Sequence, residues 1–217
     1  MERNTIAVLG RPERSGELMG RTLPEGWDWH AVESQEGMEA DALLQAMGIF
    51  VLQKAMFAAL PERVMEAGIP VFVDAVCETT ASLPDHRSIV RLNGWPGFLD
   101  RPLLELAAPE DRRPAAEALL HALGWDFRWV ADEAGMVTAR ILAMVVNEAC
   151  RAVREGVSVP EEVDTAMRLG AAYPAGPFEW AKRIGPERIV RLLGVLSEKA
   201  SLYTPCPDML EILSTKA

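Results

Sequence analysis

The sequence lacks any run of about 18 apolar residues, and it therefore predicts no membrane-spanning helix. The N-terminal segment MERNTIAVLG is charged and leads directly into a strand-like run, which is not typical of a signal peptide. We therefore expect a cytoplasmic protein that has no membrane partner.

Cysteine and histidine are scarce, with three residues of each type in 217. The cysteines at positions 77, 150 and 206 are far apart, odd in number and not clustered with histidine. This spacing argues against a disulfide framework and against a zinc site, so we expect ordinary reduced cysteines and no bound metal.

Positive charge is also in deficit, because 22 Lys and Arg face 32 Asp and Glu, which gives a formal charge of −10. Nucleic acids and anionic membranes are bound mainly by neutralising phosphate charge, so neither is an expected partner. An anionic ligand would need a local basic patch.

The first apolar run, residues 4–10, resembles the first strand of a nucleotide-binding sheet, but no G-x-G-x-x-G fingerprint follows it. The glycines stand at Gly10, Gly16 and Gly20. Between them, Pro12 removes a backbone N–H where a phosphate needs donors, and Glu13 adds repulsion. We therefore expect a scaffold turn here and assign no cofactor-binding residues to it.

Hydrophobic periodicity divides the chain into two parts. Up to residue 131, short apolar runs alternate with helical patterns, which predicts a reduced Rossmann-like, mostly parallel α/β sheet domain. From residue 132 to 217 the pattern is helical only, and the compact turn 132–135 forms the expected boundary. The expected strands are 4–10, 27–32, 48–52, 71–75, 88–92 and 125–130, and the expected helices are 37–47, with Leu43, Leu44 and Met47 inward, 54–67, interrupted at Pro61, and 110–123, ended by Gly124.

In the helical part, residues 155–185 carry two strong helix starts, at Pro160 and at Pro177. A long helix before them carries a broad apolar stripe, and helices near 187–199 and 207–213 follow. The stripe contains Met136, Val137, Ile141, Met144, Val145, Ala149 and Val153. The first hairpin helix has an expected apolar face of Val163, Ala166, Met167, Leu169 and Gly170, opposite Glu161, Glu162, Asp164 and Arg168.

Five segments of this part occur in the same order as the motifs of one family. Residues 132–142, 147–149, 155–157, 160–167 and 173–179 read DEAGMVTARIL, NEA, EGV, PEEVDTAM and YPAGPFE. They closely resemble D-x-P-G-F-V-x-N-R-L-L, N-E-A, E-G-V, P-E-D-I-D-x-A-M and H-P-x-G-P-F-E of the C-terminal domain of 3-hydroxyacyl-CoA dehydrogenases. Some members of that family fuse two copies of the architecture, and this chain resembles the second, reduced copy standing alone.

The resemblance extends into the first part, with losses at the site. Residues 78–84 look like the family's S-N-T-S-S-L-P loop, and residues 91–97 followed by 103–106 look like G-x-H-F-F-N-P followed by L-V-E-V. In this register Ala81 replaces the substrate-contacting serine, Asn93 replaces the catalytic histidine and Ala139 replaces the motif's asparagine. The carboxylate that orients the histidine is retained as Glu105, twelve residues after Asn93.

These replacements bear directly on the chemistry that the family implies. Oxidation of a 3-hydroxyacyl thioester needs a general base with a pKa near 7, which histidine supplies and asparagine cannot. Three hypotheses remain open. The first is a dimerising subunit that binds acyl-CoA or a full-length dehydrogenase partner without transferring hydride. The second is an active NAD-dependent dehydrogenase whose base has moved to Glu105 or His86. The third is a ligand-free structural or regulatory homodimer.

Other polar residues add little to the choice between these hypotheses. His30 and His121 are expected to be structural or solvated. A group of arginines could meet the phosphates of coenzyme A, although ordinary surface arginines are the simpler interpretation. They are Arg87, Arg91, Arg101, Arg112 and Arg113.

Overall fold

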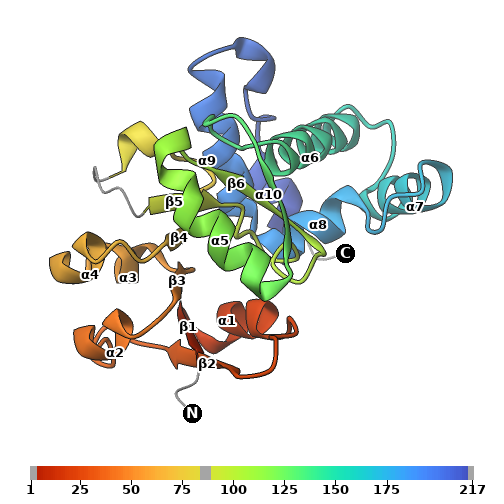
Figure 1. Ribbon diagram of the computed structural model, residues 1–217. Coiled ribbons are helices and arrows are strands. Elements are labelled where there is room, and N and C mark those ends of the chain that lie inside the picture. Colours follow the sequence, from red (N-terminus) through yellow and green to blue (C-terminus); the bar gives the residue numbers. More distant parts are fainter. Residues whose placement is uncertain (1–3, 84–88, 215–217) are drawn as a thin grey trace. The chain divides into compact units, whose positions relative to one another are not determined.

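The computed structural model describes residues 4–83 and 89–214, and the chain divides into two compact units, Met1–Met136 and Val137–Ala217 (Figure 1). The sequence places the boundary earlier, at residue 132. The intervening turn stays with the first unit because its groups bond there: the Gly135 N–H donates to the carbonyl of Val76 at 2.7 Å.

The described part of the first unit is built on a seven-stranded sheet in the order β2-β1-β3-β4-β5-β6-β7. Each neighbouring pair is parallel except β5 and β6, which confirms the mostly parallel sheet. The strands are β1 (Asn4–Leu9), β2 (Trp27–Val32), β3 (Gly48–Val51), β4 (Val71–Asp74), β5 (Ile89–Leu92), β6 (Leu103–Ala107) and β7 (Asp126–Trp129).

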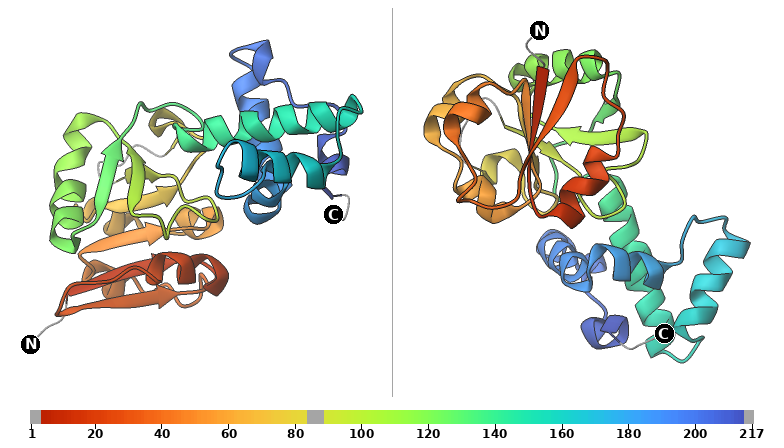
Figure 2. Two further views of the ribbon diagram at one scale, coloured as in Figure 1. Left: turned by 90° about the vertical axis from the view of Figure 1, so that its right-hand side faces the viewer. Right: turned by 90° about the horizontal axis from the view of Figure 1, so that it is seen from below.

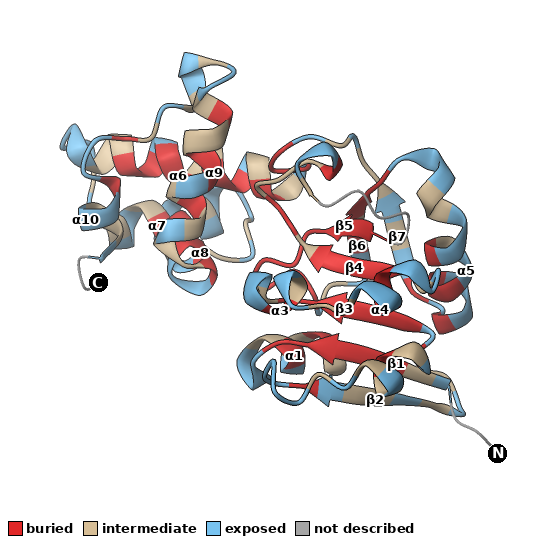
Figure 3. Cartoon of the chain, turned by 90° about the vertical axis from the view of Figure 1, so that its left-hand side faces the viewer, coloured by how far each residue is buried: buried red, intermediate tan, exposed pale blue. Residues whose placement is uncertain are grey.

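Helices cover both faces of this sheet, because alternate strand residues point to opposite sides. On one face Ile6 and Val8 belong to a buried cluster that includes residues of α1 (Pro12–Met19) and α5 (Arg113–Leu123). On the other face Ala7 and Leu9 belong to a second cluster with α2 (Ala40–Leu44), α3 (Lys54–Ala58) and α4 (Glu62–Glu66). Figure 3 shows the central strands buried along their lengths.

Two elements of the first unit differ from the sequence prediction. A helix stands where a scaffold turn was expected, and a seventh strand joins the six that were expected. Helix α1 begins at Pro12 directly after the first strand, so Gly16 lies inside a helix and Gly20 caps it. Strand β6 was not predicted from the pattern. It runs antiparallel to β5 because the connection between them holds no crossover helix.

The helices on the second face are shorter than expected. The predicted helix 37–47 ends at Leu44, so Met47 is 49% exposed and its expected inward position is wrong. The predicted interruption at Pro61 is confirmed, since α3 ends at Ala58 and α4 begins at Glu62. Two short 3₁₀ turns complete the unit, η1 (Thr80–Ser82) and η2 (Glu110–Arg112).

The second unit is helical, as predicted. Proline stands at the first turn of α7 and of α8, which confirms both predicted helix starts. The long helix α6 packs against α8 and α9 (Figure 2). The elements are α6 (Thr138–Arg154), α7 (Pro160–Gly170), α8 (Pro177–Ile184), α9 (Pro186–Ser197), η3 (Ser201–Tyr203) and α10 (Met209–Ser214).

The buried face of α6 matches the predicted stripe only in part, since Met136, just before the helix, and Ala149 are buried as predicted. Small residues such as Ala139 and Ala143 face inward, whereas Val137 is 47% and Ile141 is 55% exposed. Asn147 is also buried; its side chain donates to the Thr204 carbonyl and accepts from the Cys206 N–H. The buried face of the helix therefore combines small residues with Leu142 and Val146, and Ile141 lies outside it.

Helix α7 follows the expected orientation only in part. Val163 and Met167 of the predicted apolar face are half-buried, and Glu161, Glu162 and Arg168 of the predicted polar face are exposed. The single buried residue of the helix is Asp164, from the face predicted to be polar, while Leu169 is 82% exposed. The Asp164 carboxylate accepts the backbone N–H groups of Phe178 at 2.8 Å and Glu179 at 3.2 Å. The carboxylate thus satisfies otherwise unpaired donors at the start of α8. In the described residues no helix has the length and apolar composition that crossing a bilayer requires.

Candidate functional site

Asn93 and Glu105 lie side by side after β5 and on β6. The antiparallel pairing of these strands continues past Leu92, since the Asn93 N–H donates to the Glu105 carbonyl at 3.1 Å. The two side chains also meet, because Asn93 Nδ2 donates to Glu105 Oε2 at 3.0 Å. Asn93 is 3% exposed, and its Oδ1 accepts the N–H of Trp95.

This pair is a fixed hydrogen bond and not an acid–base couple. A primary amide neither takes up nor releases a proton near neutral pH, so Asn93 cannot act as a general base. Glu105 is the titratable member, and its carboxylate is held by the amide. The family resemblance aligns Asn93 with a histidine and Glu105 with its carboxylate, and the structure places these two side chains in contact.

A second polar network crosses the carboxyl edge of the sheet from helix α1. The guanidinium of Arg14 donates to the carbonyl of Gly94 and lies 3.4 Å from Asp74 Oδ2, at the end of β4. A Cβ added to Gly94 would lie 2.7 Å from the Asp74 Cβ, so only glycine permits this approach. One turn further along α1, Glu17 accepts the N–H of Gly97 at 2.5 Å. Both α1 side chains therefore hold the loop that follows β5.

The strand order reverses at β1, and in open α/β sheets dinucleotides bind outside the carboxyl ends of the strands at such a point. At that point the backbone after β1 closely approaches the residue that follows β3. A Cβ on Gly10 would lie 3.2 Å from the Cβ of Leu52, and the Leu52 N–H donates to the Leu9 carbonyl. With Pro12 in the first turn of α1 and Arg14 lying across the edge, these residues do not fit a dinucleotide.

Three described members of the arginine group bond to separate parts of the sheet unit. Arg91 is fully buried, so its expected surface position is wrong; it bonds to the Ala75 carbonyl and to Asp132. Arg101 bonds to the Gly97 carbonyl, and Arg113 bonds to the Ala108 carbonyl. These side chains stabilise separate loops of the sheet unit. Arg87, like His86, lies outside the described residues.

The other predicted positions belong to other elements than the Asn93–Glu105 pair. Ala81 is exposed in η1 of the sheet unit, and Ala139 is fully buried in the first turn of α6 in the helical unit. His30 lies in β2, and His121 packs against Phe127 with ring centroids 5.4 Å apart. The described residues contain no cluster of three or more side chains that could hold a metal.

Sequence reasoning missed Arg14, Glu17 and Asp74 as site residues. Asp74 stood at the end of a predicted strand, which is a position that favours functional groups in parallel sheets. The two α1 residues were hidden because the segment was expected to be a turn. Their contacts join positions 60 and 80 residues apart, which local patterns do not report.

Comparison with known proteins agrees with the motif order. Residues 135–214 match the family described as 3-hydroxyacyl-CoA dehydrogenase, C-terminal domain. Residues 135–214 thus form a domain of the type found at the C-terminus of 3-hydroxyacyl-CoA dehydrogenases. It is 44% identical over 79 residues to the 3-hydroxyadipyl-CoA dehydrogenase of Escherichia coli (strain K12), a match that covers 36% of this chain and 17% of that protein.

Two further relatives define how far the likeness extends. A probable 3-hydroxybutyryl-CoA dehydrogenase of Bacillus subtilis (strain 168) is 36% identical over 104 residues, covering 47% of this chain and 36% of that protein. The crystal structure of (S)-3-hydroxybutyryl-CoA dehydrogenase from Ralstonia eutropha has a TM-score of 0.66 over 96% of this chain and 93% of its own, at 19% identity. The sequence matches thus span well under two thirds of the curated relatives, while the fold of the family is present throughout.

Proposed function

We propose that this chain is a cytoplasmic, dimerising subunit of the 3-hydroxyacyl-CoA dehydrogenase family that binds acyl-CoA and does not itself transfer hydride. The observation that carries the proposal is the hydrogen bond between Asn93 and Glu105. In the register of the family resemblance, this buried amide stands where the reaction requires a base. Loss of that base alone is expected to lower turnover by about two to four orders of magnitude.

The residues at the carboxyl edge of the sheet also argue against NAD binding. Pro12 offers no backbone N–H to a phosphate in the first turn of α1, and the Arg14 side chain is held by Gly94 and Asp74. We therefore assign no resident nicotinamide cofactor to this chain. The support for acyl-CoA as ligand is the set of relatives named for 3-hydroxyadipyl-CoA and 3-hydroxybutyryl-CoA.

The decisive experiment measures NADH oxidation by the purified protein with acetoacetyl-CoA, beside a full-length 3-hydroxybutyryl-CoA dehydrogenase as positive control. Binding of acetoacetyl-CoA and of NADH is measured by calorimetry on the same sample. We expect binding of the thioester, no measurable binding of NADH and no turnover. Turnover by this chain that Glu105→Gln abolishes would refute the proposal and identify Glu105 as a relocated base.

Two other outcomes distinguish the remaining hypotheses. Turnover that survives Glu105→Gln and is lost in His86→Ala would place the base at His86. An affinity for acyl-CoA indistinguishable from zero would leave only a ligand-free structural or regulatory role.

Dimerisation is proposed from exposed apolar side chains of the helical unit. Ile141 is 55% and Leu202 is 60% exposed, and both border a shallow depression together with Met144, Val145 and Tyr203. An exposed apolar patch of this kind marks an association surface, and a two-fold axis would pair it with the same patch on a second copy.

Sedimentation at micromolar concentration tests the dimer. Ile141→Asp with Leu202→Asp is expected to shift the protein to a monomer, whereas Met47→Asp, at a comparably exposed apolar residue of the sheet unit, is the control and leaves the dimer intact. A monomeric unmodified protein contradicts this part of the proposal. Association only with an added full-length dehydrogenase would replace the homodimer with a mixed complex.

A further inference from the structure

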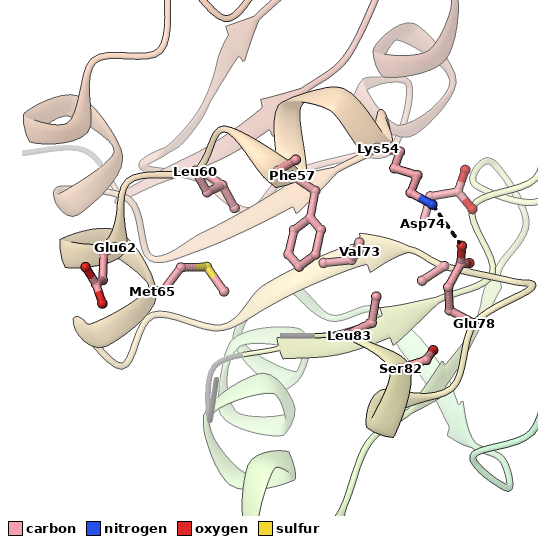
Figure 4. Close-up of a pocket in the computed structure, with 12 residues that line it drawn as sticks. Lys54, Phe57, Leu60, Glu62, Met65, Val73, Asp74, Glu78, Ser82 and Leu83 are labelled. Atoms are coloured by element: carbon pink, nitrogen blue, oxygen red, sulfur yellow. Dashed lines mark ion pairs between the residues drawn. The ribbon is translucent and has the colours of Figure 1, made fainter. Parts of the chain in front are cut away.

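The sheet unit contains a hollow of about 430 Å³ between α3, α4, the end of β4 and η1 (Figure 4). It lies beside the break at Pro61, where α3 stops at Ala58 and α4 restarts at Glu62. The lining residues are Lys54, Phe57, Ala58, Leu60, Glu62, Met65, Val73, Asp74, Ala75, Glu78, Ser82 and Leu83.

The walls of this hollow are apolar. Phe57, Leu60 and Leu83 are half-buried and pack on the edge of the core cluster that covers this face of the sheet. Met65 and Val73 are buried behind them. The volume lies in the range of small-molecule pockets, which are usually lined mainly by apolar side chains with a few polar groups for orientation. An apolar body would gain free energy here by covering the half-buried side chains.

Three of the four charged lining groups gather at one end, while Glu62 lies at the other. Figure 4 shows Lys54, Asp74 and Glu78 together, with Phe57, Leu60 and Met65 extending away from them. The Lys54 ammonium lies 3.7 Å from Glu78 Oε1; its side chain is 76% exposed, whereas that of Glu78 is 18% exposed.

The sign of the local charge selects the ligand. The lining contains the carboxylates of Glu62, Asp74 and Glu78 and the single ammonium of Lys54. Arg14 offsets Asp74 from outside the hollow, so the remaining charge is negative. An anionic molecule such as an acyl-CoA or a nucleotide is disfavoured by repulsion, while a cation is attracted to the sheltered Glu78 carboxylate.

We propose that this hollow binds a small amphiphile with an apolar body and a primary ammonium head, whose head takes the place of the Lys54 ammonium beside Glu78. The proposal rests on the cavity and its charges and is independent of the proposed role in acyl-CoA binding. Lys54 is the internal competitor: its long, mostly exposed side chain swings away at little cost when the ligand head arrives.

Three probes that share a six-carbon chain test the head group: hexylamine, hexanol and hexanoate. Affinity for the full-length protein is measured by calorimetry at low ionic strength. We expect hexylamine to bind most tightly and hexanoate most weakly, with the preference reduced by added salt. Hexanoate binding as tightly as hexylamine, or no binding of any probe, overturns the proposal.

Substitutions at the charged end separate this site from general surface attraction. Lys54→Ala removes the competitor and is expected to raise hexylamine affinity about threefold or more, while Glu78→Gln lowers it to the level of hexanol. Lys182→Ala, at an exposed lysine of the helical unit, is the charge-matched control and leaves all affinities unchanged. A Lys54→Ala protein that binds hexylamine more weakly contradicts the exchange.

A substitution at Phe57 tests whether the hydrocarbon chain of the ligand lies in the hollow. Phe57→Ser is expected to weaken all three probes and to preserve their order, and its melting curve confirms that the sheet unit remains folded. Unchanged affinities in folded Phe57→Ser protein would place the ligand elsewhere and overturn the assignment.

Discussion

The amide nitrogen Nδ2 of Asn93 lies 3.0 Å from Oε2 of Glu105, and the backbones of the same two residues are also hydrogen-bonded. The side-chain pair thus sits on a rigid element, at the start of the loop that leaves β5. Because a hydrogen bond to a charged group contributes about 1.5–3 kcal/mol, this contact stabilises the loop that leaves β5.

Asn93→Asp should therefore destabilise the protein in a pH-dependent way. It places two carboxylates in direct contact, so one of them must be protonated in the folded state and its pKa is raised above the unfolded value. The stability that this proton confers is lost as the pH rises above about 4, and the deficit should be larger at pH 7 than at pH 5. Denaturant unfolding at the two pH values measures it.

The double variant Asn93→Asp with Glu105→Gln is the matched control. It exchanges the amide and the carboxylate and restores one donor and one acceptor, so stability at neutral pH should recover most of the loss. If Asn93→Asp lowers the free energy of unfolding equally at both pH values, then the shape of the side chain, and not its charge, determines the stability of this contact.

Asp132→Asn should destabilise the sheet unit by about 3 kcal/mol, because it leaves the guanidinium of Arg91 buried without its carboxylate. Partial burial raises the pKa of Asp132, but hydrogen bonds from the Thr80 backbone and from Arg91 outweigh it, and the pKa is lowered overall. The stabilisation is thus present above about pH 4 and is lost as the pH falls through the folded-state pKa.

The difference in the free energy of unfolding between the unmodified protein and Asp132→Asn should accordingly shrink as the pH falls from about 5 towards 3. Asp208→Asn serves as the control, since the Asp208–Arg154 pair is exposed on both sides at 3.9 Å and should contribute little at any pH. A difference that stays constant with pH would mean that the charge of Asp132 is unimportant.

The sequence was a good guide where a local cause decides the structure. Proline at the first turn predicted the starts of α7 and α8, and Pro61 predicted the break beside the hollow in the sheet unit. The apolar runs predicted six of the strands because buried strands read as continuous hydrophobic segments. These features need no knowledge of distant residues.

Prediction failed where tertiary contacts choose the side of an element. Asp164 looked like a solvated residue, and its burial follows from the α8 backbone donors that it accepts. Leu169 looked like a core residue and is exposed. At the site, the pairing of Asn93 with Glu105 could be expected only from the family resemblance, whereas the contact of Arg14 with Asp74 joins elements that no local pattern connects.

Thiol reactivity should distinguish the three cysteines in the native protein. Cys150 and Cys206 are buried, and burial raises the pKa of Cys150 to about 12 and also raises that of Cys206. Because the thiolate is the reactive form, neither should react with a disulfide reagent until the helical unit opens, even at pH 9. In the native protein we expect rapid reaction of the half-buried Cys77 alone. In denaturant we expect all three cysteines to react rapidly.

Cys77→Ser should remove the rapid phase and leave the slow one. Rapid labelling of two or more thiols under native conditions would show that the helical unit opens readily.

Gly176→Ala should destabilise the helical unit by more than about 2 kcal/mol, although its backbone conformation suits alanine. The added Cβ would lie 2.4 Å from the Cβ of Asp164 and closer still to its carboxylate, so the side chain must leave the amides of Phe178 and Glu179. Gly194→Ala in α9 is the matched control: its Cβ meets open space, and alanine should stabilise the helix by about 0.5–1 kcal/mol. Denaturant unfolding gives both values, and hydrogen exchange at Phe178 and Glu179 should accelerate only in Gly176→Ala. Equal stability of the two variants would mean that α7 and α8 adjust freely at this corner and that Asp164 does not fix it.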